Sequence, residues 1–87
     1  MNYCTIQGVL NDDTLRDFIN KANDFNQNEE LTIYINSCGG TCGIADALVY
    51  FIDSYPKDVT LVGNCVLASW AFVLFMKSNS RKELKPK

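Results

Sequence analysis

The stretch LTIYINSCGGT at Leu31–Thr41 determines the fold class of this chain. Apolar and more polar residues alternate over 31–36, which predicts a strand with one buried face. Gly39 and Gly40 predict a turn within the rest of the stretch, and an apolar helical pattern begins near Cys42. A strand that leads through a short turn into a helix is the repeating unit of an α/β fold.

Strands and helices alternate on both sides of this stretch. Asn11 and the two aspartates after it predict a helix start, because a side-chain oxygen caps the first N–H groups and acids suit the positive end of the helix dipole. Pro56 predicts the end of the second helix. A β-α-β-α-β-α order with short loops predicts a mainly parallel sheet with right-handed crossovers. We expect strands at 3–7, 31–36 and 59–65, and helices from 12 to about 25, from 42 to 55 and from 67 to 77.

Size and composition predict one small globular domain over residues 1–87. Hydrophobic residues make up 47% and charged residues 21%, which are ordinary globular values and exclude global disorder. A net charge of −2 is no electrostatic footprint for nucleic acid. The sequence contains no histidine, which excludes a Ser-His or Cys-His pair within these residues. We therefore expect no nucleic-acid partner, no cofactor and no metal.

Charge and hydrophobicity are unevenly distributed. Residues 1–58 carry three cations and nine anions, whereas residues 77–87 carry five cations and one anion, so we expect 78–87 to form a basic, solvated tail. The helix expected at 67–77 is apolar nearly all round, which predicts that it is buried. The apolar run Leu61–Met76 has 16 residues, fewer than the roughly 20 that cross a bilayer. With no signal segment at the start, we expect no membrane partner and a cytoplasmic protein whose four cysteines stay free thiols.

Two features with chemical potential follow successive strands. Gly39 and Gly40 allow backbone N–H groups to face a ligand where a helix begins. Ser69 lies near the start of the third helix, where N–H groups can stabilise an oxyanion. Each feature alone is also explained as ordinary turn or capping chemistry. Together they predict a site, because the carboxyl ends of parallel strands lie at one edge of a sheet.

These segments resemble the proteolytic subunit of the Clp protease. That family carries Tyr-Ile-Asn-Ser-Pro-Gly-Gly-Ser where this chain has Tyr34–Thr41. Val59–Val62 and Ala68–Ala71 are similar to its nucleophile segment, in which Ala-Ala-Ser-Met-Gly precedes an apolar helix, and Ile6–Asp13 resembles its opening strand and helix start. The resemblance covers the N-terminal half of a family domain. It implies a ββα-type spiral of the Clp-protease/crotonase kind, truncated, with a mainly parallel sheet and three helices.

The resemblance also implies roles for four residues. Ser69 takes the nucleophile position, the backbone N–H groups of Gly40 and Trp70 take the oxyanion-hole positions, and Gly39 shapes the turn. It implies a polypeptide substrate, assembly with copies of this chain or with a full-length relative, and an ATP-dependent unfoldase as a partner. The family's histidine and aspartate have no counterpart in these 87 residues, so Ser69 has no general base and we expect the chain alone to be inactive.

A lysine base for Ser69 is one alternative. Lys77 lies eight residues along the expected helix, about 12 Å from Ser69, which is too far for a hydrogen bond. Lys82, Lys85 or Lys87 would have to fold back to reach the serine hydroxyl.

Three further alternatives stay open. The four cysteines, among them Cys38 where the family has proline, have the ligand type of a zinc site, although Cys4 and Cys65 lack paired spacing. The crotonases share the spiral and use an oxyanion hole without a serine nucleophile, but the Asn-Ser-x-Gly-Gly pattern at 36–40 favours the peptidase branch. The last alternative is a non-catalytic interaction protein that docks on a full-length Clp-type relative.

Overall fold

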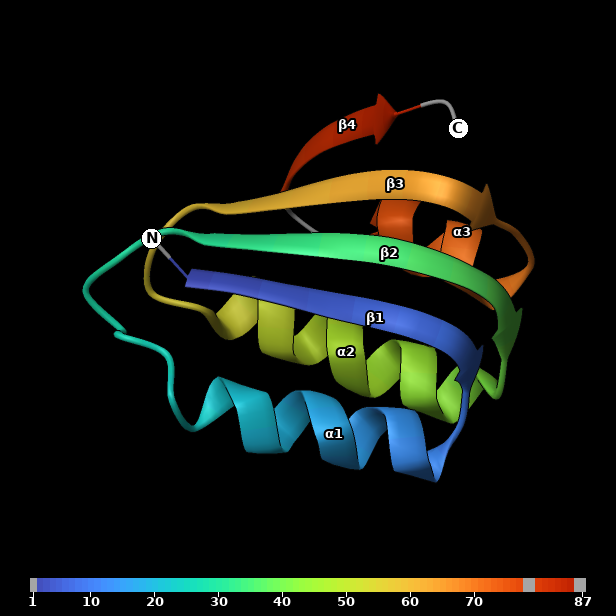
Figure 1. Ribbon diagram of the computed structural model, residues 1–87, viewed down its shortest axis with the longest axis horizontal. Coiled ribbons are helices and arrows are strands. Elements are labelled where there is room, and N and C mark those ends of the chain that lie inside the picture. The colour runs from blue at the N-terminus through green and yellow to red at the C-terminus, as the bar shows by residue number, and fades with distance from the viewer. Residues whose placement is uncertain (1, 78–79, 86–87) are drawn as a thin grey trace.

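The computed structural model describes residues 2–77 and 80–85. Four strands and three helices alternate along this part of the chain (Figure 1). The strands are β1 (Asn2–Leu10), β2 (Leu31–Gly40), β3 (Val59–Leu67) and β4 (Arg81–Lys85), and the helices are α1 (Asp12–Ala22), α2 (Cys42–Ser54) and α3 (Trp70–Lys77).

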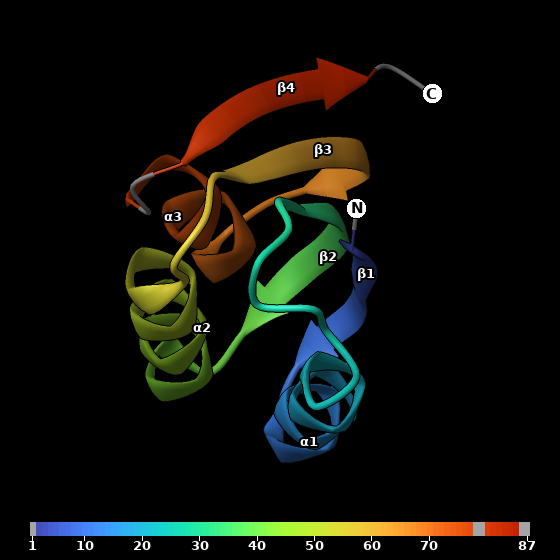
Figure 2. The same ribbon diagram turned by 90° about the vertical axis from the view of Figure 1, so that its left-hand side faces the viewer.

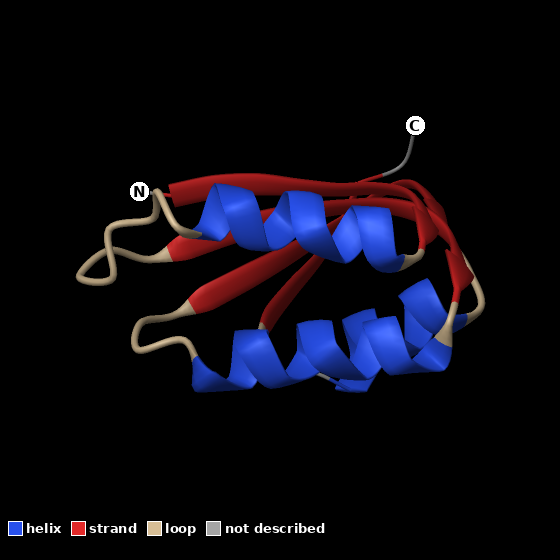
Figure 3. Ribbon diagram, turned by 90° about the horizontal axis from the view of Figure 1, so that it is seen from below, coloured by secondary structure: helices blue, strands red, loops and turns tan. Residues whose placement is uncertain are grey.

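The four strands form one parallel sheet in the order β1-β2-β3-β4. Sequence order and spatial order are therefore the same, so each helix crosses over in the same direction. With crossovers of one hand, this order places every helix on the same face of the sheet. Figures 2 and 3 show this arrangement, with the three helices on one face and the other face open. The expected α/β class with a mainly parallel sheet and three helices is confirmed.

The hydrophobic core lies between the sheet and the helices. In β2, Leu31, Ile33 and Ile35 are fully buried, whereas the alternating Thr32, Tyr34 and Asn36 are half-buried on the open face. The helices contribute to the core side chains that include Phe18, Leu48, Ile52 and Leu74. Among the described residues, no helix is long and apolar enough to cross a membrane.

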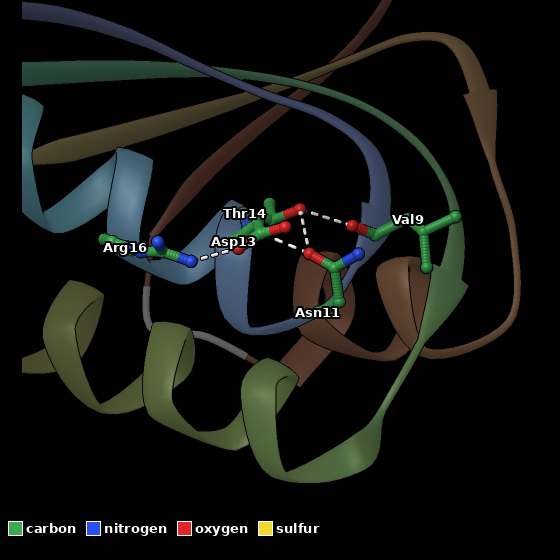
Figure 4. Close-up of polar contacts among 5 residues, drawn as sticks. All are labelled: Val9, Asn11, Asp13, Thr14 and Arg16. Atoms are coloured by element: carbon green, nitrogen blue, oxygen red, sulfur yellow. Dashed lines mark hydrogen bonds and ion pairs between the residues drawn. The ribbon is translucent and has the colours of Figure 1, made fainter.

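Helix α1 begins at a well-formed cap, as Asn11 predicted (Figure 4). The Asn11 side-chain oxygen accepts a hydrogen bond from the Thr14 backbone N–H at 3.0 Å. The Thr14 hydroxyl donates to the Val9 carbonyl oxygen, and Arg16 forms an ion pair with Asp13. The bond from Thr14 to Val9 ties the first turn of α1 to the end of β1, and the other two contacts lie within the start of the helix.

Three elements differ from expectation. The prediction of a turn within 37–41 is wrong, because β2 continues to Gly40. The pairing of β2 to β3 is irregular between Ile35 and Ser37. Helix α3 begins at Trp70, three residues later than expected. Residues 81–85, expected to lie in a basic tail, form β4, a short charged strand of the kind that protects the edge of a sheet.

The third helix, which its apolar pattern predicted to be buried, is only partly buried within this chain. Ala71, Leu74 and Phe75 are buried, whereas the side chains of Trp70, Val73 and Met76 are 38%, 37% and 56% exposed. Because these three follow one another at intervals of three residues, they form one exposed apolar face of α3. We call this the α3 face.

Candidate active site

Gly39 and Ser69 lie directly against each other at the carboxyl edge of the sheet. A Cβ atom built on Gly39 would lie 2.7 Å from the Ser69 Cβ and 3.1 Å from its Oγ. Gly39 has a φ of +104°, a left-handed conformation that favours glycine. Any side chain at Gly39 would occupy the space beside the serine, so this glycine is required for the close approach.

The buried residue Ser37 connects the segment that contains Gly39 to the segment that contains Ser69. Its side chain is 1% exposed, and its hydroxyl donates to the Gly8 carbonyl oxygen while accepting from the Gly39 N–H at 3.1 Å. Its backbone carbonyl accepts from the Ala68 N–H at 3.2 Å. Ser37 thus links the end of β1 to Gly39 and to Ala68, the residue before Ser69.

Sequence reasoning did not single out Ser37 as a site residue. The available signal was a hydroxyl on the buried face of an otherwise apolar strand, since such a group needs hydrogen-bond partners. The second partner became visible only with the fold, because Gly8 lies 29 residues away along the chain.

Ser69 precedes α3, although the sequence suggested a position within the helix. Its φ of +55° places it in the left-handed region, which non-glycine residues adopt rarely and often at functional sites. The Ser69 carbonyl oxygen accepts from the Val73 N–H at 3.2 Å, which is the first bond of the helix. The Ser69 side chain is exposed.

The two residues expected to supply oxyanion donors have different surroundings. Trp70 is the first residue of α3, so its N–H belongs to the first turn, whose N–H groups lack helical acceptors four residues back. Gly40 pairs with Leu10, and a Cβ on Gly40 would collide with the Leu10 backbone. Gly40 therefore has a structural reason to be glycine.

The cysteines are dispersed. Cys38 and Cys42 are exposed free thiols, and Cys4 is a buried one. Burial raises the pKa of the Cys4 thiol. Among the described residues, His, Cys, Asp and Glu form no group of three that could hold a metal. The side chain of Cys65 lies outside the described part.

Lys82 lies far from Ser69. Its Cα pairs with Leu61, six residues before the end of β3, which is about 20 Å along a strand. Its ammonium group donates to the Ser80 carbonyl oxygen at 3.1 Å. The side chains of Lys77 and Lys85, and all of Lys87, lie outside the described residues.

Comparison with known proteins identifies the fold. No family model and no curated protein matches the sequence. Among solved structures, the ClpP protease catalytic domain from Plasmodium falciparum is similar with a TM-score of 0.74 and 22% identity, covering 85% of this chain and 44% of that one. A ClpP1 mutant from Listeria monocytogenes is similar with a TM-score of 0.78 and 23% identity, covering 88% of this chain and 46% of that one.

The resemblance to the Clp protease proteolytic subunit is therefore confirmed at the level of fold. The described residues have the fold of part of a ClpP catalytic domain. The chain spans less than half the length of the solved chains it matches.

Proposed function

We propose that this chain carries the nucleophile and oxyanion-hole part of a serine peptidase-like site. Ser69 is the nucleophile, the N–H groups of Gly40 and Trp70 bind the developing oxyanion, and Gly39 leaves room for the reacting carbonyl. The observation that carries the proposal is the contact between Gly39 and Ser69, with the serine in a left-handed conformation just before a helix. Removing one oxyanion-hole donor from a peptidase typically raises the barrier by about 2.7–4 kcal/mol.

The proposed site lacks an activating base. A serine hydroxyl is a weak nucleophile until a base removes its proton. The 87 residues contain no histidine, and the Lys82 ammonium is bonded at the far end of the sheet. The chain alone is accordingly inactive as a peptidase in this proposal.

The similarity to ClpP catalytic domains gives the proposal its substrate and partner classes. The substrate is a polypeptide, and the chain acts in an assembly with copies of itself or with a full-length relative, served by an ATP-dependent unfoldase in the cytoplasm. In an assembly with a full-length relative, that relative supplies the missing histidine base, whereas further copies of this chain contain no histidine to supply it.

Labelling with a fluorophosphonate and a chemical substitute for the base tests the site. We expect slow labelling of the chain, accelerated about tenfold or more by added imidazole, with the adduct on Ser69. Ser69→Ala removes the adduct, whereas Ser54→Ala, at the exposed end of α2, leaves it unchanged. Rapid labelling without imidazole contradicts the missing base, and an adduct spread over several serines contradicts the oxyanion hole.

The α3 face favours a second candidate function, namely non-catalytic docking on a full-length Clp-type relative. Exposed apolar groups gathered on one face are typical of interaction sites. Mixing the chain with a purified full-length ClpP-type protein and measuring co-sedimentation tests this function. Val73→Asp abolishes association if the α3 face docks, whereas the matched Ser54→Asp on α2 does not. Equal association of the two variants contradicts docking through α3.

A further inference from the structure

The outer edge of β1 is open to a further strand. β1 is an edge strand of the sheet, and a groove of about 470 Å³ is lined by residues of β1, of α1 and by Tyr34 of β2. Tyr3, Cys4 and Thr5 line the groove from the strand, and Asp17 and Lys21 line it from α1. The edge therefore lies beside a hollow flanked by two opposite charges.

Alternate backbone groups of β1 point away from β2, toward the free side of the strand. The Asn2 N–H donates to the Glu30 carbonyl oxygen at 3.0 Å, so Asn2 directs its backbone groups toward β2. In a strand the direction alternates, and Tyr3, Thr5 and Gln7 therefore direct their N–H and C=O groups away from the sheet. The free edge ends at Val9, whose carbonyl oxygen accepts from the Thr14 hydroxyl.

The two edges of the sheet differ in how they resist pairing. β4 reads RKELK, with charges at four of its five positions, and charged side chains discourage another strand from adding to an edge. β1 reads NYCTIQGVL, with no charge and no proline over nine residues. Over residues 2–7, before the irregularity in its pairing to β2 between Gln7 and Val9, β1 thus has no charge, proline or bulge, the features by which exposed edges usually avoid association.

The charges on α1 indicate which strand would pair with β1. Asp17 and Lys21 are one helical turn apart on the side of α1 that faces the groove. If two copies meet around a two-fold axis near Thr5, the two α1 helices run side by side in opposite directions. Asp17 of each copy then faces Lys21 of the other, which is charge-complementary in both halves.

We propose that β1 pairs antiparallel with β1 of a second copy of this chain, with Thr5 opposite Thr5. Tyr3 then lies opposite Gln7 on the open face, and Cys4 lies opposite Ile6 on the helix side. All these pairs are neutral, and the outward backbone groups of Tyr3, Thr5 and Gln7 gain partners. The contact is isologous and closes at two copies. It does not rest on the proposed peptidase-like site, nor does it involve the α3 face.

Disulfide cross-linking tests the pairing and its register. In a background of Cys38→Ser and Cys42→Ser, we introduce Thr5→Cys or Gln7→Cys. The Cα atoms of directly opposite, hydrogen-bonded residues lie about 5.5 Å apart, which suits a disulfide. Two copies of residue 7 would be offset by four positions, about 13 Å along the strand.

We expect Thr5→Cys to form a covalent dimer at least about tenfold faster than Gln7→Cys under mild oxidation, since only the first pair meets disulfide geometry. Val73→Asp, on the α3 face, leaves the cross-link unchanged. Equal rates for the two cysteine positions overturn the proposed register.

Charge reversal tests the partner. Asp17→Lys and Lys21→Asp each place like charges opposite one another, and we expect either change to weaken dimerisation about tenfold or more by analytical ultracentrifugation at low salt. The double variant restores the opposite charges and with them the dimer. A chain that remains monomeric at every concentration, or a double variant that is no tighter than the single ones, overturns the proposal; monomeric behaviour would assign the edge to a different extended peptide.

Discussion

Two junctions in this protein begin a helix after a strand, and they do so in different ways. One joins β1 to α1, and the other joins β3 to α3. At the first, Asn11 and Thr14 satisfy the helix start with side-chain oxygens, and the turn is secured by local bonds. At the second, Ser69 adopts a left-handed conformation and leaves its side chain exposed. The first junction is organised for stability. The second accepts backbone strain and places a hydroxyl against a glycine, which is the pattern that functional sites follow.

The largest loss of stability is expected where Gly40 of β2 approaches Leu10 of β1. A Cβ on Gly40 would lie 2.8 Å from the Leu10 backbone nitrogen and 2.9 Å from its carbonyl carbon, and backbone atoms cannot move aside. We expect Gly40→Ala to lower the free energy of unfolding by about 3 kcal/mol or more, measured by urea denaturation.

Gly43→Ala is the matched control for this change. Gly43 lies in the first turn of α2, and a Cβ there would have nothing within 4 Å. We expect no loss of stability and a gain of up to about 1 kcal/mol, because alanine favours a helix over glycine. Similar denaturation midpoints for the two variants would show that the approach of β2 to Leu10 is not tight.

The next largest loss of stability is expected at Ser37, which is hydrogen-bonded to the end of β1 and to the residue before Ser69. Ser37→Ala removes the acceptor of the buried Gly39 N–H and the donor to Gly8, and we expect a loss of about 2 kcal/mol in the free energy of unfolding. Ser54→Ala, which changes an exposed serine, should cost less than about 0.5 kcal/mol. An unchanged urea midpoint for Ser37→Ala would contradict its linking role.

The cap of α1 gives a smaller effect, because its groups are exposed to water. Asn11→Ala removes the oxygen that accepts from the Thr14 N–H, and we expect a cost of about 1 kcal/mol by thermal and urea unfolding. Asn20→Ala, on the exposed side of the same helix, lacks this role and should be neutral or slightly stabilising. A larger loss of stability for Asn20→Ala than for Asn11→Ala would contradict the capping role of Asn11.

The sequence was most informative where a local pattern decides the outcome. Alternation over 31–36 predicted the buried face of β2, and Asn11 predicted the start of α1 to the residue. Pro56 marked the end of α2 to within two residues. These signals depend on side chains and neighbours in sequence, so they can be recognised before the fold is known.

The sequence was least informative where distant segments decide the backbone. Gly39 and Gly40 suggested a turn, but pairing with Val9 and Leu10 keeps them in the sheet. The charged residues at 81–85 suggested a solvated tail, yet β3 supplies a partner for an edge strand. The left-handed conformation of Ser69 carries no sequence signal, since glycine would be the ordinary choice there.

The smallest effect concerns the reactivity of the cysteines. It compares Cys4, which is buried in β1, with Cys38 and Cys42, which are exposed on either side of Gly39 and Gly40. Cys4 is 6% exposed, and burial raises the pKa of its thiol, so both access and thiolate fraction are reduced. Cys38 and Cys42 are exposed. In folded protein at pH 8 we expect iodoacetamide to modify Cys38 and Cys42 at least about tenfold faster than Cys4, as followed by peptide mass mapping. In urea the difference should vanish, because unfolding exposes Cys4 and returns its pKa to the ordinary thiol value. Equal rates in the folded protein would mean that β1 opens readily, and the buried position of Cys4 would then not describe the protein in solution.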